Sequence, residues 1–221
     1  MSYQLVLFDW DGTVMDSIDR IVSSVKTVAK RAQLTEPTAD QVRDVIGLSL
    51  APALEVLFPK ITEHQINLLQ GYYRDEYEEY DDTATPIFDG IEQVLQYFQQ
   101  QNIQLAVATG KTRAGLDRLL EESGLSHYFC DSMTADEAKS KPDPDMINRL
   151  AARHNIEKQH ILMIGDSILD IGMANNAGVD SIAVSYGAHT HEKLSKQQPL
   201  AIVAKPQEII DIVKRVGQPT K

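Results

Sequence analysis

Two aspartates near the start of the chain, Asp9 and Asp11, are the residues best suited to chemistry. They follow an apolar run over residues 5–8 and precede Gly12, which permits a tight turn. A carboxylate at the carboxyl end of a parallel strand lies where open α/β sheets form their active sites. Two carboxylates so close in sequence favour a bound cation, or a proton on one of them. One can attack phosphorus while the other protonates the leaving oxygen and later activates water, so the pair predicts phosphoryl chemistry.

Two further segments carry groups that handle phosphate. Thr109 and Gly110 follow a strand expected over 104–108, and a threonine hydroxyl and the next backbone amide donate well to phosphoryl oxygens. Lys141 lies in the run Ser-Lys-Pro-Asp-Pro, where proline restricts the backbone and the ammonium group can neutralise charge on a phosphoryl group. Each segment alone also fits a simpler interpretation, namely an ordinary strand-to-helix turn or a solvated loop lysine.

Asp166 and Asp170 form the fourth segment, after an apolar run that ends in Gly165. A helix starting at the strand end would bring these two side chains, four residues apart, toward one point. Carboxylate oxygens are the hard ligands that Mg²⁺ prefers. An acidic helix N-terminus, favoured by the helix dipole, is the alternative. Taken together, the four segments predict a magnesium-dependent phosphoryl-transfer site.

The elements that must position these residues alternate between strand and helix. The stretch 91–101 has apolar residues at helical spacing, and similar segments separate the apolar runs. This alternation predicts a doubly wound parallel sheet with helices on both faces. The expected strands are 4–8, 104–108, 160–164, 181–184 and, more weakly, 201–204.

Residues 17–85 interrupt the alternation. This stretch contains helical patterns and no convincing strand, and Thr38 is a good N-cap for the second of its helices because Gln41 follows three residues later. We therefore expect a helical insertion after the first strand. The expected helices are 18–34, 38–46, 50–58 and 63–80.

Composition limits the classes of protein that fit. The 221 residues can hold one core with a small second domain, and 43% hydrophobic and 24% charged residues are ordinary globular values. A net charge of −11 with no basic run argues against nucleic acid or an anionic membrane as a partner. No apolar stretch approaches the roughly 20 residues of a membrane span. We therefore expect a cytoplasmic protein.

The cysteine and one histidine pair have simpler interpretations. Cys130 is the only cysteine, so an intramolecular disulfide and a thiolate metal cluster are excluded, and we expect it to be a small core residue. His189 and His191 follow the fourth expected strand without a nearby third ligand, which favours a surface loop over a metal site.

The chain resembles the haloacid dehalogenase superfamily of phosphotransferases from residue 5 to about 205, on the strength of the four segments above. Within the superfamily it is similar to the phosphoglycolate phosphatase-like branch, whose small helical cap follows the first motif. The resemblance implies a Rossmann-like catalytic core of residues 1–15 and 85–221. The cap would be residues 16–84, with Asp16 near the hinge.

The resemblance also implies a role for each catalytic residue. Asp9 would be the nucleophile that forms an aspartyl-phosphate, and Asp11 the general acid and base. Thr109 and the Gly110 amide would hold the phosphoryl group. Lys141 would stabilise Asp9 and the group in transfer.

The same resemblance implies a Mg²⁺ cofactor. Its ligands would be Asp9, Asp166 and the backbone carbonyl of Asp11, with Asp170 supporting them. The substrate would be a small phosphorylated metabolite, and the protein a monomer or a homodimer.

Differences between this sequence and related branches of the superfamily limit the reactions that it is expected to catalyse. Dehalogenases of the superfamily lack the second aspartate, so Asp11 favours phosphorus over a carbon–halogen bond. The phosphoglucomutase branch tends to carry Gly-x-Ser-Arg in its cap, whereas this chain has Leu50 at the arginine position after Gly47, Leu48 and Ser49. Gly47 and Leu48 are candidate specificity residues. A pyrophosphatase, a phosphotransferase or mutase with the same core, and a non-enzymatic phosphate-binding protein stay open as alternatives.

Overall fold

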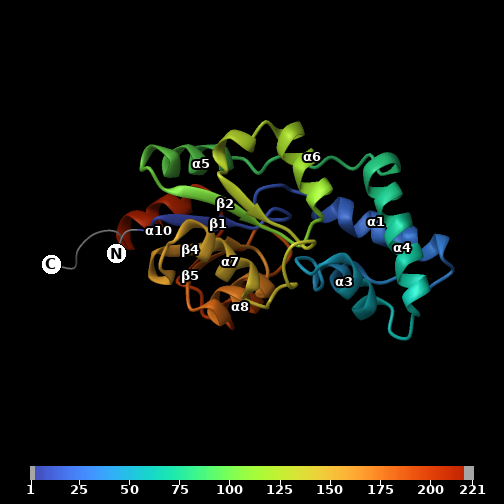
Figure 1. Cartoon of the computed structure of the whole chain (residues 1–221). Helices are drawn as coiled ribbons and strands as arrows, with labels where there is room; N and C mark the ends of the chain where they lie inside the picture. Colours follow the sequence, from blue (N-terminus) through green and yellow to red (C-terminus); the bar gives the residue numbers. More distant parts are fainter. Residues whose placement is uncertain (1–2, 217–221) are drawn as a thin grey trace.

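The computed structural model describes residues 3–216, which contain a six-stranded sheet between two layers of helices (Figure 1). All strand pairs are parallel, and the order is β3-β2-β1-β4-β5-β6. The prediction of a doubly wound parallel α/β sheet is therefore confirmed. The strands are β1 (Leu5–Phe8), β2 (Gln104–Ala108), β3 (Asp131–Met133), β4 (Ile161–Gly165), β5 (Asp180–Val184) and β6 (Ala201–Val203).

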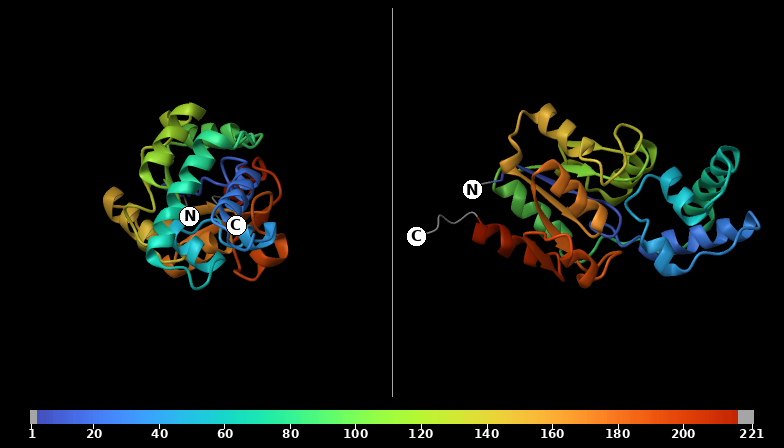
Figure 2. Two further views of the ribbon diagram at one scale, coloured as in Figure 1. Left: turned by 90° about the vertical axis from the view of Figure 1, so that its right-hand side faces the viewer. Right: turned by 90° about the horizontal axis from the view of Figure 1, so that it is seen from below.

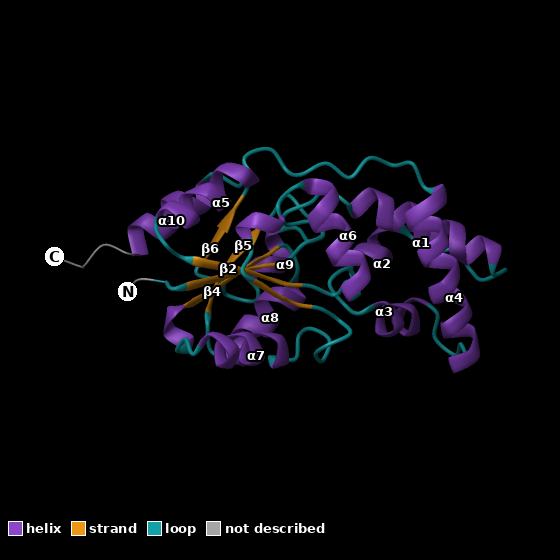
Figure 3. Ribbon diagram, turned by 45° about the horizontal axis from the view of Figure 1, so that its top comes forward, coloured by secondary structure: helices purple, strands orange, loops and turns teal. Residues whose placement is uncertain are grey.

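Side chains of the central strands enter apolar cores on both faces of the sheet. In β1, Val6 and Phe8 pack in one cluster and Leu5 and Leu7 in another, as the two-residue period of a strand requires. Helices cover both faces of the sheet (Figure 3). The central strands β1 and β4 are therefore apolar along their whole length. The first cluster includes residues of α5 (Ile91–Gln100), α6 (Arg113–Ser123) and α10 (Glu208–Val216), and the second includes residues of α7 (Asp145–His154) and α8 (Ile168–Ala177).

The strand order reverses direction at β1, which pairs with β2 on one side and β4 on the other. Open α/β sheets bind ligands at such a switch point, beyond the carboxyl ends of the strands. Asp9, Thr109 and Asp166 directly follow β1, β2 and β4. The topology therefore brings three of the predicted site residues to one place.

The segment after β1 is helical, as expected, and contains no strand within its described residues. We call residues 18–80 the helical group. It packs around its own apolar clusters, in which Val28, Leu54 and Leu69 are almost fully buried. The group lies beyond the sheet, at the end opposite α10 (Figures 1 and 2). Its elements are α1 (Ile18–Arg31), α2 (Ala39–Arg43), α3 (Leu50–Leu57), α4 (Glu63–Asp75) and a π-helical turn (Glu76–Tyr80).

Two neighbouring segments connect the helical group to the sheet. The backbone N–H of Asp16 donates to the carbonyl of Pro86 at 2.8 Å, and that of Phe88 donates to the carbonyl of Val14 at 3.1 Å. The entry and exit of the group therefore lie side by side and are held by backbone hydrogen bonds.

Several sequence-based details differ in the structure. The first helix ends at Arg31 because Gln33 adopts a left-handed φ of 57°, and the predicted fourth helix ends as the π-helical turn. The three-residue strand β3 was not predicted, since it lies at the sheet edge and has no apolar run. Cys130, next to this edge strand, is exposed, so the prediction of a core cysteine was wrong. No helix in residues 3–216 has the length and apolar character needed to cross a membrane.

The only tryptophan, Trp10, tests how the core next to the site is stabilised. Its side chain is fully buried, and its ring centre lies 6.2 Å from that of Phe129 in an edge-on arrangement. Its Nε1 has no hydrogen-bond partner in residues 3–216. We expect Trp10→Ala to lower the free energy of unfolding by about 3–5 kcal/mol, because it leaves a large cavity. Trp10→Phe keeps an aromatic ring and removes an unpaired donor, so its loss should be less than half as large.

Urea unfolding followed by far-UV circular dichroism measures both variants, since neither retains tryptophan fluorescence. Equal losses for the two variants would contradict the account of an unpaired indole nitrogen.

Candidate active site

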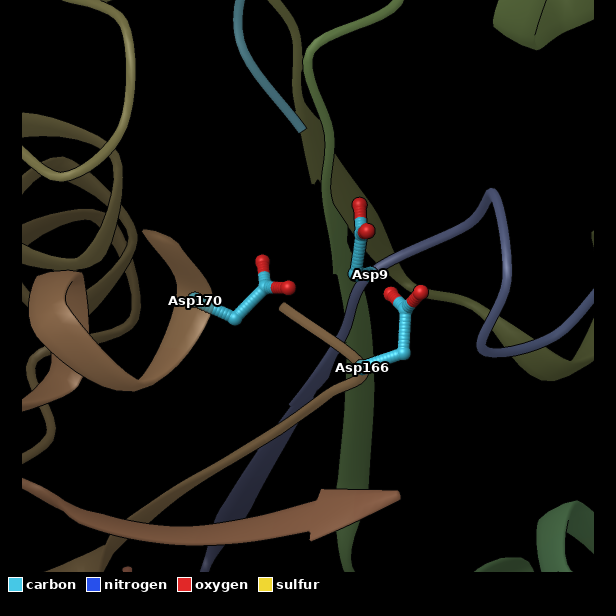
Figure 4. A group of neighbouring side chains, drawn as sticks. All are labelled: Asp9, Asp166 and Asp170. Atoms are coloured by element: carbon cyan, nitrogen blue, oxygen red, sulfur yellow. The ribbon is translucent and has the colours of Figure 1, made fainter. Parts of the chain in front are cut away.

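Three buried carboxylates form the centre of the site. Asp9, Asp166 and Asp170 are at most 1% exposed, and one oxygen from each lies within 4.8 Å of the others. Figure 4 shows the three side chains turned toward a common space from the end of β1, the end of β4 and helix α8. The structure thus brings together the aspartates that the sequence placed at two separate strand ends.

The start of helix α8 sets the direction of Asp170. Ser167 is the N-cap, and its Oγ accepts a hydrogen bond from the backbone N–H of Asp170 at 3.2 Å. Asp170 Oδ2 in turn accepts from the Ser167 N–H at 3.0 Å, which completes a capping box. Asp166 therefore precedes the helix. Both carboxylates nevertheless reach the same space, as the predicted helix start at the strand end implied.

Lys141 lies between two of the carboxylates. Its Nζ donates to Asp9 Oδ1 at 2.7 Å and to Asp170 Oδ1 at 2.6 Å, with the lysine side chain fully buried. Burial alone would lower the pKa of Lys141, but the charges of Asp170 and Asp9 raise it above the ordinary lysine value. The lysine is therefore charged and holds one oxygen of each carboxylate in place.

Asp166 is held by neutral donors. Thr13 Oγ1 donates to its Oδ1 at 3.1 Å, and the backbone N–H of Ala188 donates to its Oδ2 at 2.6 Å. A Cβ atom at Gly12 would lie 2.2 Å from Asp166 Oδ2, and Gly12 has a φ of +74°. Only glycine fits there, because both the space and the backbone conformation exclude a side chain.

The pKa values of Asp9 and Asp166 reflect the burial and the negative charge of the cluster. Burial, the largest cause, and the charge of Asp170 together raise the pKa of Asp9 to about 7, although Lys141 opposes the rise. Burial also raises the pKa of Asp166 well above its usual range, assisted by the charges of Asp170 and Asp9. One ammonium group therefore does not balance three buried carboxylates.

The donor set fits a divalent cation. It offers three hard carboxylate oxygens, and Asp9 Oδ2 is buried without a hydrogen-bond partner in the described part of the chain. Mg²⁺ prefers such oxygen ligands and would supply the missing positive charge.

Asp11 contacts residues other than those of this carboxylate cluster. Its Oδ1 accepts from Ser17 Oγ at 2.5 Å and lies 3.1 Å from Lys111 Nζ. The same ammonium group lies 4.7 Å from the ring centre of Tyr77, which belongs to the helical group. Lys111 was not predicted as a site residue, although its place directly after Thr109 and Gly110 was a usable signal.

The predicted phosphate-binding residues meet the helical group. Thr109 is 1% exposed, and its Oγ1 accepts from the backbone N–H of Lys111 at 3.2 Å. A Cβ atom at Gly110 would lie 2.6 Å from the carbonyl oxygen of Leu48 and 2.7 Å from that of Gly47. The two candidate specificity residues therefore lie against the predicted phosphate-binding turn.

A cavity of about 340 Å³ separates the strand ends from the helical group. Asp9, Asp11, Thr109, Gly110 and Lys111 line its sheet side. Residues of α1 to α4 line the other side. The cavity is therefore shared between the two parts of the chain.

His189 lies beside the site and corrects another expectation. Its side chain is 1% exposed, and Nδ1 accepts from the backbone N–H of Ile168 at 3.0 Å. Its Nε2 lies 3.4 Å from Asp44 Oδ1 of the helical group, and burial lowers the pKa of the imidazole. The prediction of a surface histidine was wrong here because the helical group covers the loop, whereas His191 is exposed.

Comparison with known proteins agrees with this geometry. The family model of haloacid dehalogenase-like hydrolases matches residues 6–184. The chain belongs to this family. Phosphoglycolate phosphatase of Vibrio vulnificus is 26% identical over 219 residues, covering 95% of this chain and 96% of that protein. A Caldanaerobacter subterraneus protein named as pyrophosphatase PpaX is 30% identical, covering 97% and 96% of the two chains.

Solved structures of the family share the fold. A haloacid dehalogenase-like hydrolase from Bacteroides fragilis superposes with a TM-score of 0.86 at 26% identity. The match covers 94% of this chain and all of that one. The sheet and the helical group therefore belong to one known architecture.

The raised pKa of Asp9 predicts a pH-dependent stability for the metal-free protein. The folded chain keeps a proton on Asp9 up to about pH 7, whereas the unfolded chain releases it near the ordinary value of 3.8. The stabilisation is thus complete at low pH and is lost as the pH rises to about 7. In the presence of a chelator, Tm should fall between about pH 4 and about pH 7.

Added Mg²⁺ should raise Tm more at the higher pH, because it binds the deprotonated carboxylates. Differential scanning calorimetry measures both effects, and Asp9→Asn should make the chelated profile flatter. A chelated wild-type Tm that rises over this interval would contradict the assigned proton affinity.

Proposed function

We propose that the protein is a Mg²⁺-dependent phosphomonoester hydrolase that acts on a small phosphorylated metabolite through an aspartyl-phosphate. The observation that carries this proposal is the Lys141 ammonium group between Asp9 and Asp170, with Asp166 beside them at the switch point of the sheet. Family membership supports hydrolysis, and a relative named phosphoglycolate phosphatase supports a small phosphate ester.

Asp9 is the proposed nucleophile. Lys141 binds its Oδ1, which fixes the carboxylate, while Oδ2 has no hydrogen-bond partner in residues 3–216. A carboxylate with one oriented oxygen and one unpaired oxygen is suited to attack on phosphorus. Thr109 Oγ1, the Gly110 amide and Lys141 would bind the phosphoryl oxygens, since hydrogen bonds to charged oxygens are the strong ones.

Asp9, Asp166 and the backbone carbonyl of Asp11 would hold the cation, with Asp170 supporting them through Lys141 and Ser167. A bound Mg²⁺ would neutralise charge on the phosphoryl group. Lys141 adds a fixed positive charge on the same group, in a site from which bulk water is largely excluded.

Asp11 is the proposed general acid and base. Ser17 Oγ and Lys111 Nζ hold its carboxylate on the cavity side of the strand end. From there it would protonate the leaving oxygen and then take a proton from the water that attacks the aspartyl-phosphate.

Residues 16–84 are the proposed cap and residues 1–15 with 85–221 the catalytic core. The paired connections at Asp16 and Pro86 support a hinge there. Closure of the cap over the carboxylates would exclude water and select the leaving group. The pyrophosphatase name of one relative keeps pyrophosphate as the second substrate to test.

We expect Asp9→Asn to lower turnover of p-nitrophenyl phosphate at least about 1,000-fold, because the amide cannot form the phosphoenzyme. Hydrolysis is measured with and without Mg²⁺, and wild-type activity should disappear on chelation. Asp211→Asn, an exposed aspartate on α10, is the matched control. Mg²⁺-dependent turnover retained by Asp9→Asn would sink the mechanism.

Asp11→Asn should separate the two chemical steps. The p-nitrophenolate leaving group needs no proton, so the first step should proceed and release about one equivalent of product per enzyme. The second step lacks its base, so steady-state turnover should fall by about 100-fold or more. Rapid-mixing absorbance measurements detect the burst, and a slow rate without a burst would assign Asp11 elsewhere.

A further inference from the structure

We propose that the leaving group of the substrate is largely apolar and longer than two carbons, so that the enzyme prefers phosphomonoesters of aliphatic alcohols to those of small hydroxy acids. This inference rests on the proposed phosphatase function and concerns the substrate side of the same cavity.

The helical group lines the cavity mainly with aliphatic side chains. Contributions come from α1, from α2 and the loop after it, and from α3. They include Ile21, Val25, Val45, Leu48, Leu50 and Leu57. The part of the cavity beyond the carboxylates therefore offers apolar contact to whatever is attached to the phosphate.

Val45 and Ala53 are apolar lining residues that do not belong to the core of the helical group. They are 5% and 8% exposed, yet neither is part of an apolar cluster of residues 3–216. Both line the cavity instead. Apolar side chains that line a cavity and belong to no core cluster are suited to contact a bound ligand.

The volume supports a ligand of several carbons. An empty apolar cavity destabilises a fold, and apolar walls bind water poorly. A volume of about 340 Å³ falls within the range of small-molecule sites and holds roughly ten groups the size of a water molecule. A phosphoryl group occupies only part of it.

Charge on the cavity wall disfavours a short anionic leaving group. Lys111 is paired with Asp11, and Arg118 with Glu78 and Glu122. Arg74 is unpaired in the described part of the chain, but it is exposed at the wall. A carboxylate attached close to phosphorus would therefore meet no free buried cation.

A series of substrates tests the inference directly. We expect kcat/KM to rise from ethyl to butyl to hexyl phosphate, by about fourfold for each methylene buried in the cavity. The kcat/KM for hexyl phosphate should be higher than that for phosphoglycolate. Calorimetric titration of the Mg²⁺-loaded protein with ethyl- and hexylphosphonate should show the same order of affinity without turnover.

Two variants alter the cavity without touching the carboxylates. Val45→Thr places a hydroxyl in the apolar wall and should lower kcat/KM for hexyl phosphate about fivefold or more, with little effect on ethyl phosphate. Val56→Thr, on an α3 residue that is 60% exposed, is its control. Ala53→Leu fills part of the cavity and should also lower kcat/KM for hexyl phosphate but not for ethyl phosphate. Its control is Ala152→Leu on the exposed surface of α7, which should change kcat/KM for neither substrate.

The outcomes separate the inference from the function on which it rests. If phosphoglycolate is hydrolysed fastest and chain length has no effect, the phosphatase function stands and the apolar leaving group is wrong. If no phosphate ester, including p-nitrophenyl phosphate, is hydrolysed, the proposed function fails and the inference fails with it.

Discussion

The ion cluster of Lys141 is the interaction on which the rest of the site depends. Three carboxylates and one ammonium group lie out of contact with bulk water, and burial of unpaired charge is costly. The hydrogen bonds from Lys141 to Asp9 and Asp170 make the arrangement possible, but they leave a negative excess. The fold therefore contains a built-in demand for a cation or a proton at the switch point of its sheet.

The surrounding structure meets the geometric conditions of that cluster. The order of the strands places the ends of β1 and β4 side by side, and the capping box of α8 holds Asp170 at its start. Gly12 leaves room for Asp166 where any side chain would collide. Backbone topology, a helix cap and one glycine thus position the charges, whereas the apolar clusters on either face of the sheet keep that frame rigid.

Sequence was informative where local pattern determines position. Apolar runs ending in Asp9, Thr109 and Asp166 identified three strands correctly, because buried parallel strands are apolar and their ends converge. Lys111 was missed although it directly follows Thr109 and Gly110. His189 was misplaced because its environment depends on the helical group, whose Asp44 lies far away in sequence. Strand β3 was not predicted because a short strand at the edge of the sheet needs no apolar pattern.

The contact at Gly110 has a consequence for how this architecture can change. The helical group meets the proposed phosphate-binding turn there through the carbonyl oxygens of Gly47 and Leu48. Main-chain atoms are the same for every residue type, so this docking point does not depend on the Leu48 side chain. Under the proposed function, substitutions along the aliphatic wall can therefore change substrate choice while the sheet and the helical group keep their alignment. Gly110 itself cannot vary in this way, because any side chain there would collide with these carbonyl oxygens.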